Sequence, residues 1–194
     1  MHISLFLSEI EPGTMIRFLA KTVFHLIGWK VRGDHRPDLT RKVLIVAPHT
    51  SSWDVPIGLL VKTWKKIDVT FYAKKELFKG ILGWFLTKLG AAPVDRSKNN
   101  NLVGQIVHDF ATKEHHSVLL TPEGTRKKVE RFKTGFYFVA DTAKVPIIPV
   151  QFNFKKKEVY FMDPYYTSGD REKEIKEIEN MFRGIPGKIE EYSF

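Results

Sequence analysis

A histidine and an aspartate stand five positions apart in the stretch VAPHTSSWDVPIG, which runs from residue 46 to residue 58. A carboxylate that holds one imidazole nitrogen fixes the tautomer and leaves the other nitrogen free to accept a proton. On an α-helix, an offset of five residues would set the two side chains about 140° apart. His49 and Asp54 can meet only if the histidine lies in a loop and the aspartate lies in the first turn of the following helix. The sequence favours this arrangement, because the apolar run at 42–47 predicts a buried strand that Pro48 ends.

The same stretch permits a second interpretation that involves no chemistry. Ser51 and Asp54 fit the Ser/Thr-x-x-Asp/Glu pattern of a helix start, with Ser51 as the N-cap and the carboxylate bonded to free backbone N–H groups. His49 would then be an ordinary loop histidine. Taken by itself, this stretch leaves both interpretations open.

Two further groups of polar residues follow strand-like patterns. Glu-Gly-Thr-Arg at 123–126 follows an apolar run, and the carboxyl ends of parallel strands are where α/β sheets bind ligands. Gly124 lets backbone approach a ligand, Arg126 offers a planar fork suited to phosphate, and Glu123 could hold that arginine or meet a substrate hydroxyl. Arg96 follows the short run Ala-Ala-Pro-Val. Without the other motifs, these groups would be a charged turn and a surface arginine.

Together and in this order, the motifs resemble the signature blocks of the glycerolipid acyltransferase superfamily, which includes the lysophospholipid acyltransferases. The resemblance extends over residues 42–153, most of the chain. The matching residues are His49 and Asp54 in the first block, Arg96 in the second, Glu123, Gly124, Thr125 and Arg126 in the third, and Pro146 in the fourth.

The resemblance implies direct acyl transfer without a metal, a cofactor or an acyl-enzyme intermediate. His49 would be the general base that takes a proton from the hydroxyl of a lysophospholipid-type acceptor, expected to be 1-acylglycerol-3-phosphate. The acceptor oxygen would attack the thioester of acyl-CoA or of an acyl carrier protein, and Asp54 would orient His49. The residues implied in acceptor binding are Arg96, Glu123, Gly124, Thr125 and Arg126, with Lys74 and Lys75 as a nearby basic segment.

Three alternatives stay beside this interpretation. Lys127 follows Arg126 where many family members have serine, so the acceptor could be another lyso-lipid, such as an amino-acid lipid with a free hydroxyl. Ser51 and Ser52 beside His49 suggest a thioester or ester hydrolase, but the chain has no Gly-x-Ser-x-Gly elbow. A non-catalytic basic membrane-binding protein would explain the charge but not the spacing of His49 and Asp54.

The elements that position these residues alternate along the chain. Helices are predicted at 14–29, 55–66, 77–90, 100–114, 134–144 and 170–182, and strands at 42–47, 68–73, 91–94, 117–121, 145–154 and 157–162. This order predicts one α/β domain with a mostly parallel, mixed sheet flanked by helices, and the resemblance implies the glycerol-3-phosphate acyltransferase fold. His115 and His116 follow a helix pattern and are expected to be exposed.

Composition indicates the partners. Lys and Arg total 31 against 22 Asp and Glu, a net charge of +9, and the 15 Phe and 4 Trp favour an anionic membrane surface over nucleic acid. The absence of cysteine excludes disulfides, thiolate zinc sites and a cysteine nucleophile. No apolar run reaches the roughly 18 residues of a membrane-spanning helix, and the N-terminus has no signal-peptide pattern. We therefore expect a peripheral protein on the cytoplasmic face of a membrane.

The predicted helix at 14–29 is amphipathic and suits a membrane surface. Apolar residues recur along one face, and Arg17, Lys21 and His25 recur along another. Phe18, Phe24 and the apolar segment 77–90 are expected to contact the bilayer. We accordingly divide the chain into a membrane-associating segment, 1–30, and an acyltransferase domain, 31–194.

Overall fold

The apolar run that precedes His49 forms the central strand, β2 (Arg41–Ala47), in the computed structural model, which describes residues 12–94 and 102–194. Six of its seven residues are buried. Leu44 and Val46 face one layer of helices, and Val43 and Ile45 face the other. A strand that is apolar on both faces is typical of a parallel sheet covered by helices on both sides.

The described sheet has seven strands and is mostly parallel, as predicted. Every neighbouring pair is parallel except β6 and β7. The loops that follow β2 and β5 therefore leave the sheet at the same edge. Across the sheet the strands are β1 (Lys30–Arg32), β7 (Glu158–Phe161), β6 (Ile147–Asn153), β2, β5 (His116–Leu120), β3 (Thr70–Lys74) and β4 (Ala91–Val94).

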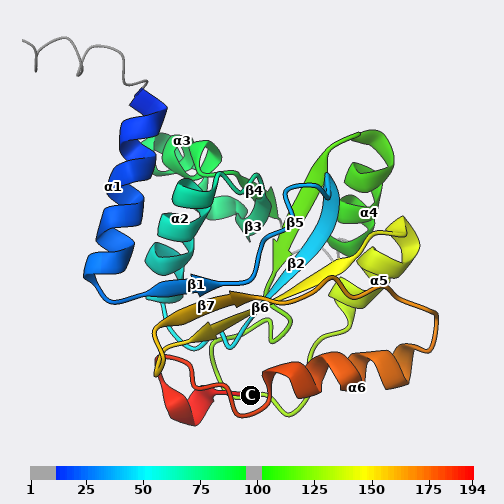
Figure 1. Ribbon diagram of the computed structural model, residues 1–194. Coiled ribbons are helices and arrows are strands. Elements are labelled where there is room, and N and C mark those ends of the chain that lie inside the picture. The colour runs from blue at the N-terminus through cyan, green and yellow to red at the C-terminus, as the bar shows by residue number, and fades with distance from the viewer. Residues whose placement is uncertain (1–11, 95–101) are drawn as a thin grey trace, which may run out of the picture.

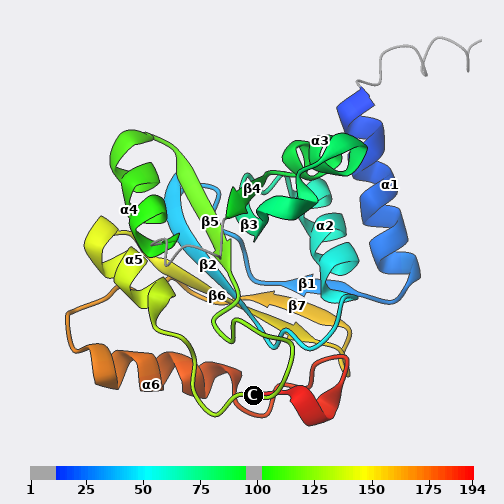
Figure 2. The ribbon, with the colours of Figure 1, turned by 180° about the vertical axis from the view of Figure 1, so that it is seen from behind.

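Helices cover both faces of the sheet (Figure 1). Side chains of α1 and α2 pack with one face of β2, and those of α4, α5 and α6 pack with the other. Figure 2 shows the same arrangement from behind, with α3 beside α1 and α2 in both views. The helices are α1 (Pro12–Leu26), α2 (Asp54–Lys65), α3 (Gly80–Lys88), α4 (Leu102–Thr112), α5 (Gly135–Ala143) and α6 (Arg171–Phe182), with 3₁₀ turns η1 (Lys75–Leu77) and η2 (Glu190–Tyr192).

The α/β domain and its order of elements confirm the prediction, with local differences. Helix α1 ends before Gly28, whose positive φ of 83° turns the chain toward β1. The segment expected to be one helix at 77–90 is divided, because residues 78 and 79 separate η1 from α3, which begins at Gly80 with a φ of 57°. Strand β1 was not predicted, since its three residues carry no apolar run. The start of the helix predicted at 100–114 lies outside the described residues.

One of the two adjacent histidines is not exposed as predicted. His116 is the first residue of β5, is buried, and lies edge-on to the ring of Phe110 at 4.8 Å. Burial lowers its pKa. His115, one residue earlier, is exposed. The prediction was wrong for His116 because the strand begins one residue earlier than the predicted strand at 117–121.

The basic side of α1 lies beside Trp64 of α2, although Lys21 and His25 stay exposed. The Arg17 Nε–H donates to the Trp64 backbone oxygen at 3.4 Å, and the ammonium of Lys21 lies 5.8 Å from the centre of the Trp64 ring. The ring of His25 contacts the same indole. The position of Phe24 was predicted wrongly: its side chain is fully buried against α2, whereas that of Phe18 is 70% exposed.

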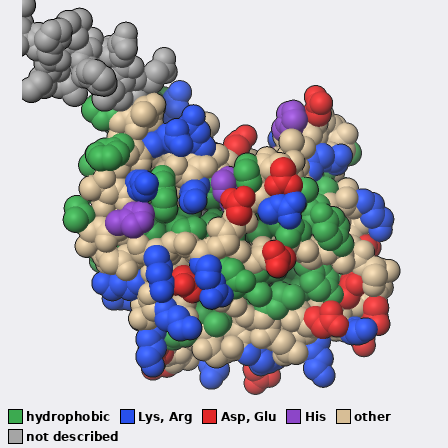
Figure 3. All heavy atoms as spheres, in the orientation of Figure 1, with side chains coloured by type: hydrophobic (Ala, Val, Ile, Leu, Met, Phe, Trp, Pro, Cys, Tyr) green, Lys and Arg blue, Asp and Glu red, His purple; other side chains and the backbone are tan. Residues whose placement is uncertain are grey.

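The apolar side of α1 is consequently turned outward. Figure 3 shows apolar side chains along the outer edge of this helix. An exposed apolar surface of this kind, next to lysine and arginine side chains, marks an interaction site more often than a plain surface. The exposed apolar residues of the helix are Met15, Ile16, Phe18, Leu19 and Leu26.

Candidate active site

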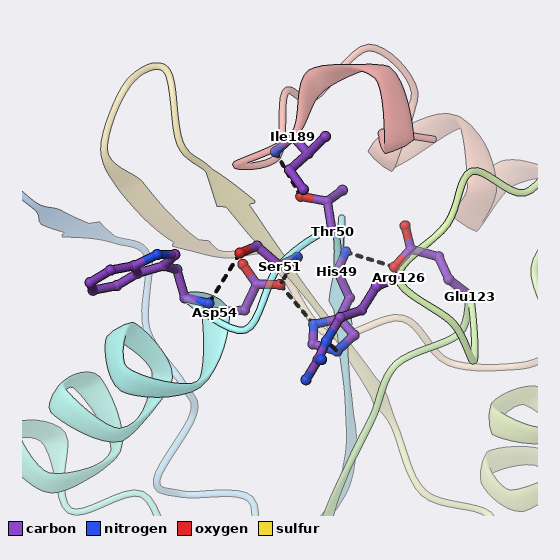
Figure 4. A network of polar contacts seen from close by, with 8 residues as sticks. His49, Thr50, Ser51, Asp54, Glu123, Arg126 and Ile189 are labelled. Atoms are coloured by element: carbon purple, nitrogen blue, oxygen red, sulfur yellow. Dashed lines mark hydrogen bonds and ion pairs between the residues drawn. The ribbon is translucent and has the colours of Figure 1, made fainter.

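His49 and Asp54 meet at the carboxyl end of β2. The Nδ1 atom of His49 lies 2.8 Å from the Oδ2 atom of Asp54 (Figure 4). His49 lies in the loop after the strand, and Asp54 is the first residue of α2. This is the arrangement that the five-residue offset predicts. With a carboxylate at Nδ1, that nitrogen carries a proton, and the Nε2 atom is the free base in the neutral ring.

The helix-start interpretation of Asp54 holds at the same time. Its Oδ2 atom also accepts the Ser51 backbone N–H at 3.2 Å. Ser51 is not the N-cap, however, because that position belongs to Trp53, whose N–H bonds to the Ser51 hydroxyl at 3.3 Å. One buried carboxylate oxygen thus binds both the imidazole and the backbone of the helix start, and these two donors hold it in place.

Glu123 joins the loop after β5 to the loop after β2. Its Oε2 atom accepts the backbone N–H of His49 at 2.7 Å, and the residue is only 2% exposed. Burial raises the pKa of Glu123 to about 7, an effect that the His49 N–H partly offsets. The geometry therefore favours a role in placing His49 over the acceptor contact implied by the resemblance.

Arg126 contacts the imidazole from the opposite side. Its Nε–H donates to His49 Nε2 at 3.3 Å, so in this structure the arginine occupies the nitrogen that would act as the base. Arg126 is otherwise exposed to solvent. Four residues, His49, Asp54, Glu123 and Arg126, are thus joined by direct hydrogen bonds and ion pairs (Figure 4).

Gly124 and Thr125 form the turn between Glu123 and Arg126. Gly124 has a φ of 65°, which favours glycine, and a Cβ atom there would lie 2.7 Å from the Nζ atom of Lys133. The hydroxyl of Thr125 accepts the Lys127 N–H at 3.3 Å. Sequence reasoning missed Lys133, whose ammonium lies over this turn. The only signal for it was the run of cations that follows the motif, Lys127, Lys128, Arg131 and Lys133.

The remaining predicted residues are less closely defined. Lys75 is exposed in η1, and Lys74 ends β3 at the sheet edge to which His49 belongs. Arg96 lies outside the described residues. The Pro146 carbonyl accepts the Val43 N–H at 2.9 Å and so supports the central strand. Within residues 12–94 and 102–194, no three His, Cys, Asp or Glu side chains gather as metal ligands would.

A sequence model of the family described as Acyltransferase matches residues 28–153, which contain all four motifs. The chain belongs to this acyltransferase family. Three similar proteins named 1-acyl-sn-glycerol-3-phosphate acyltransferase come from Streptococcus pneumoniae, Saccharomyces cerevisiae and Escherichia coli. They are 30%, 29% and 31% identical over 74%, 64% and 55% of this chain. The matches cover 56%, 43% and 45% of those proteins, so this acyltransferase-family chain spans about half their length.

A solved structure shows the same fold. The crystal structure of the 1-acyl-sn-glycerophosphate (LPA) acyltransferase PlsC from Thermotoga maritima matches with a TM-score of 0.60 at 21% identity, over 91% of this chain and 83% of that one. An acyltransferase of known structure therefore shares the overall fold of this chain.

Proposed function

We propose that this acyltransferase-family protein transfers an acyl group from a thioester to the hydroxyl of a lysophospholipid, with 1-acylglycerol-3-phosphate as the acceptor and acyl-CoA or an acyl carrier protein as the donor. The contact between His49 Nδ1 and Asp54 at 2.8 Å carries this proposal, because it leaves Nε2 as the base. The similar proteins named as 1-acyl-sn-glycerol-3-phosphate acyltransferases support the choice of acceptor.

The proposed reaction needs one base and a thiol leaving group. Nε2 of His49 takes the proton of the acceptor hydroxyl as the oxygen attacks the thioester carbonyl carbon. The C–S bond then breaks, and the sulfur leaves as a thiol with the proton that the imidazolium returns. Asp54 stabilises the imidazolium between these steps, and base catalysis of this kind contributes about 10²–10⁴ in rate.

We assign the acceptor phosphate to Arg126, assisted by Lys133 and Arg96. In the structure Arg126 donates to His49 Nε2, so it must leave before the histidine can act as a base. A phosphate offers Arg126 two parallel hydrogen bonds to a group of opposite charge, which are stronger together than its single bond to the imidazole. Binding of a phosphate-bearing acceptor would therefore free the base at the moment it is needed. Lys74 and Lys75 stay proposed contacts of the acceptor.

We also propose that the protein binds an anionic membrane peripherally, on the cytoplasmic face, with residues 1–30 as the associating segment. No helix among the described residues is long and apolar enough to cross a bilayer. The outward apolar side of α1 is one support, and the net charge of +9 is another. A third support is α3, where Ile81, Leu82 and Trp84 are exposed.

The test is product analysis with the purified protein. Labelled acyl-CoA and acyl carrier protein are each offered with 1-acylglycerol-3-phosphate, with a monoacylglycerol that lacks phosphate, and with an amino-acid lyso-lipid, and the products are read by mass spectrometry. We expect transfer to the phosphate-bearing acceptor and none with His49→Ala. Release of free fatty acid whatever the acceptor would indicate a hydrolase, and no use of either thioester would overturn the enzymatic assignment.

A further inference from the structure

The segment Gly184–Phe194, here termed the strap, crosses both loops of the candidate site. It follows α6 and contains η2. The motifs do not include it, because they end at residue 146, and the resemblance does not extend beyond residue 153. Two sets of contacts connect the strap to the active site, one on each loop.

The first contact is on Thr50, the residue that follows His49. The backbone N–H of Ile189 donates to Thr50 Oγ1 at 3.1 Å, and Thr50 is 2% exposed (Figure 4). Gly187 lies directly against the same side chain, since a Cβ atom there would be 2.5 Å from Oγ1 and 2.7 Å from Cγ2. Any larger residue at position 187 would therefore displace Thr50 and with it the loop that carries His49.

The second contact is on the loop that carries Glu123 and Arg126. The ring of Phe194 lies 4.2 Å from the ring of Phe132, which is buried. The Phe132 N–H also donates to the buried Glu179 of α6 at 2.8 Å. This end of the loop is therefore held by both the strap and α6.

The strap is itself a fixed element. The Gly187 N–H donates to Ser193 Oγ at 2.9 Å, and the Gly184 N–H donates to the Phe194 backbone oxygen at 3.2 Å. The Phe154 N–H, just beyond β6, donates to the Pro186 oxygen at 3.0 Å. These bonds give the strap a defined shape and tie it to the sheet.

We propose that the strap positions the catalytic histidine by holding Thr50, with Gly187 and Ile189 as the positioning residues; this inference rests on the proposed function. Asp54 holds the imidazole of His49 and Glu123 holds its backbone N–H. Thr50 gives the same loop a third attachment. A displacement of about 1 Å at a reacting group can lower a rate about a hundredfold, so this attachment acts on kcat.

Variants of Thr50 separate the hydrogen bond from the packing. Thr50→Val keeps the shape and loses the acceptor atom, whereas Thr50→Ser keeps the acceptor. We expect kcat to fall about three- to tenfold in Thr50→Val, the scale of one lost hydrogen bond, with the acceptor KM unchanged, and Thr50→Ser to recover most of the loss. Lys188→Ala, an exposed change in the same strap, is the matched control and should behave as wild type.

Variants of Gly187 test the close approach. Gly187→Ala should lower kcat about ten- to hundredfold. Thr50→Ala removes the two atoms nearest to the new methyl group, Oγ1 and Cγ2, and leaves only the Thr50 Cβ atom, at 3.2 Å. The double variant Thr50→Ala/Gly187→Ala should therefore be more active than Gly187→Ala. Equal or lower activity in the double variant would contradict the contact.

A spectroscopic measurement keeps the two proposals distinguishable. Long-range ¹H–¹⁵N spectra of the imidazoles report which nitrogen of His49 carries the proton. We expect Nδ1 in wild type and Thr50→Ser, and a mixture of tautomers in Thr50→Val. If the wild type transfers no acyl group, the proposed function fails, and these spectra alone decide the role of the strap. Unchanged kcat and unchanged His49 signals in folded Thr50→Val would overturn the inference. This test does not depend on whether Gly187→Ala folds.

Discussion

At the scale of single residues, the His49–Asp54 contact predicts unequal losses. His49→Ala removes the base and should abolish acyl transfer, a fall of about 10²–10⁴ or more. Asp54→Asn keeps an oxygen that can accept from Nδ1, so it should lose most of the rate but stay more active than His49→Ala. Steady-state kcat and the thermal midpoints of both variants check this. Near-normal transfer by a folded His49→Ala protein would show that the base is misassigned.

Glu123 predicts a pH dependence of stability. Its pKa is raised from an ordinary value of 4.5 to about 7, so between these pH values the folded protein holds a proton that the unfolded chain has lost. The free energy of unfolding should therefore decrease as pH rises through this interval, by less than about 1.4 kcal/mol per pH unit from this group. Glu123→Gln cannot titrate and should flatten that slope.

The Glu123 variants separate charge from the hydrogen bond to His49. The amide oxygen of Glu123→Gln can still accept the His49 N–H, so acyl transfer should largely persist. Glu123→Ala leaves this N–H without an acceptor, so acyl transfer should be lost. Urea unfolding of wild type and Glu123→Gln from pH 5 to pH 8 measures the slope. Parallel stability curves for the two proteins would rule out this titration.

Arg126 predicts opposite effects on two reactions. Arg126→Ala should raise the acceptor KM about ten- to hundredfold, the scale of a lost charged hydrogen bond, with little effect on the thioester KM. It also uncovers Nε2 of His49, so thioester hydrolysis without acceptor should rise. Lys128→Ala, an exposed cation in the same loop, is the control. An unchanged acceptor response would point to a different head group or a different phosphate site.

At the scale of elements, variants of exposed and buried residues of α1 distinguish membrane contact from folding. Phe18 is 70% exposed and Phe24 is fully buried. Phe18→Ser with Leu19→Ser should weaken binding to acidic liposomes at every salt concentration and leave the thermal midpoint unchanged. Phe24→Ser should instead destabilise the fold, by about 3–5 kcal/mol if it resembles other losses of a buried phenylalanine. Co-sedimentation and thermal unfolding measure the two effects.

High salt tests the other part of the membrane proposal. Each basic residue near an anionic surface contributes about 1 kcal/mol, which salt screens, whereas apolar insertion is not screened in this way. Liposome binding by wild type should therefore weaken with salt without vanishing. No binding to acidic or neutral liposomes at low salt would mean that α1 contacts something other than a bilayer.

At the scale of the whole molecule, the described part of the N-terminal segment, residues 12–29, contributes to the hydrophobic core as well as to the proposed membrane surface. Phe24 and Trp29 are buried in the core cluster that includes Leu44 and Ile57. Deletion of residues 1–29 should lower the thermal midpoint, because it removes both aromatic side chains from that core. Phe18→Ser with Leu19→Ser, which changes exposed residues only, is the control. An unchanged midpoint after the longer deletion would support a boundary between independent parts at residue 30.

The sequence alone determined the motifs and most of the elements, because both are encoded locally. The apolar run of β2 marks a strand buried on both faces, and the alternation of strands and helices marks a mostly parallel sheet. The five-residue offset between His49 and Asp54 also predicted their contact, since their side chains can meet when a loop residue is followed by the first turn of a helix.

Tertiary packing alone decided the rest. Glu123 turns to the His49 backbone across 74 residues, and Ile189 reaches Thr50 across 139. Such bonds depend on which loops the assembled sheet brings together, and no local pattern encodes that. The sides of α1 show the same limit: periodicity gave an apolar and a basic side, but only the packing placed Arg17 and Lys21 beside Trp64 of α2. The periodicity of a helix sequence defines which residues share a face, and only the neighbouring elements decide whether that face is covered.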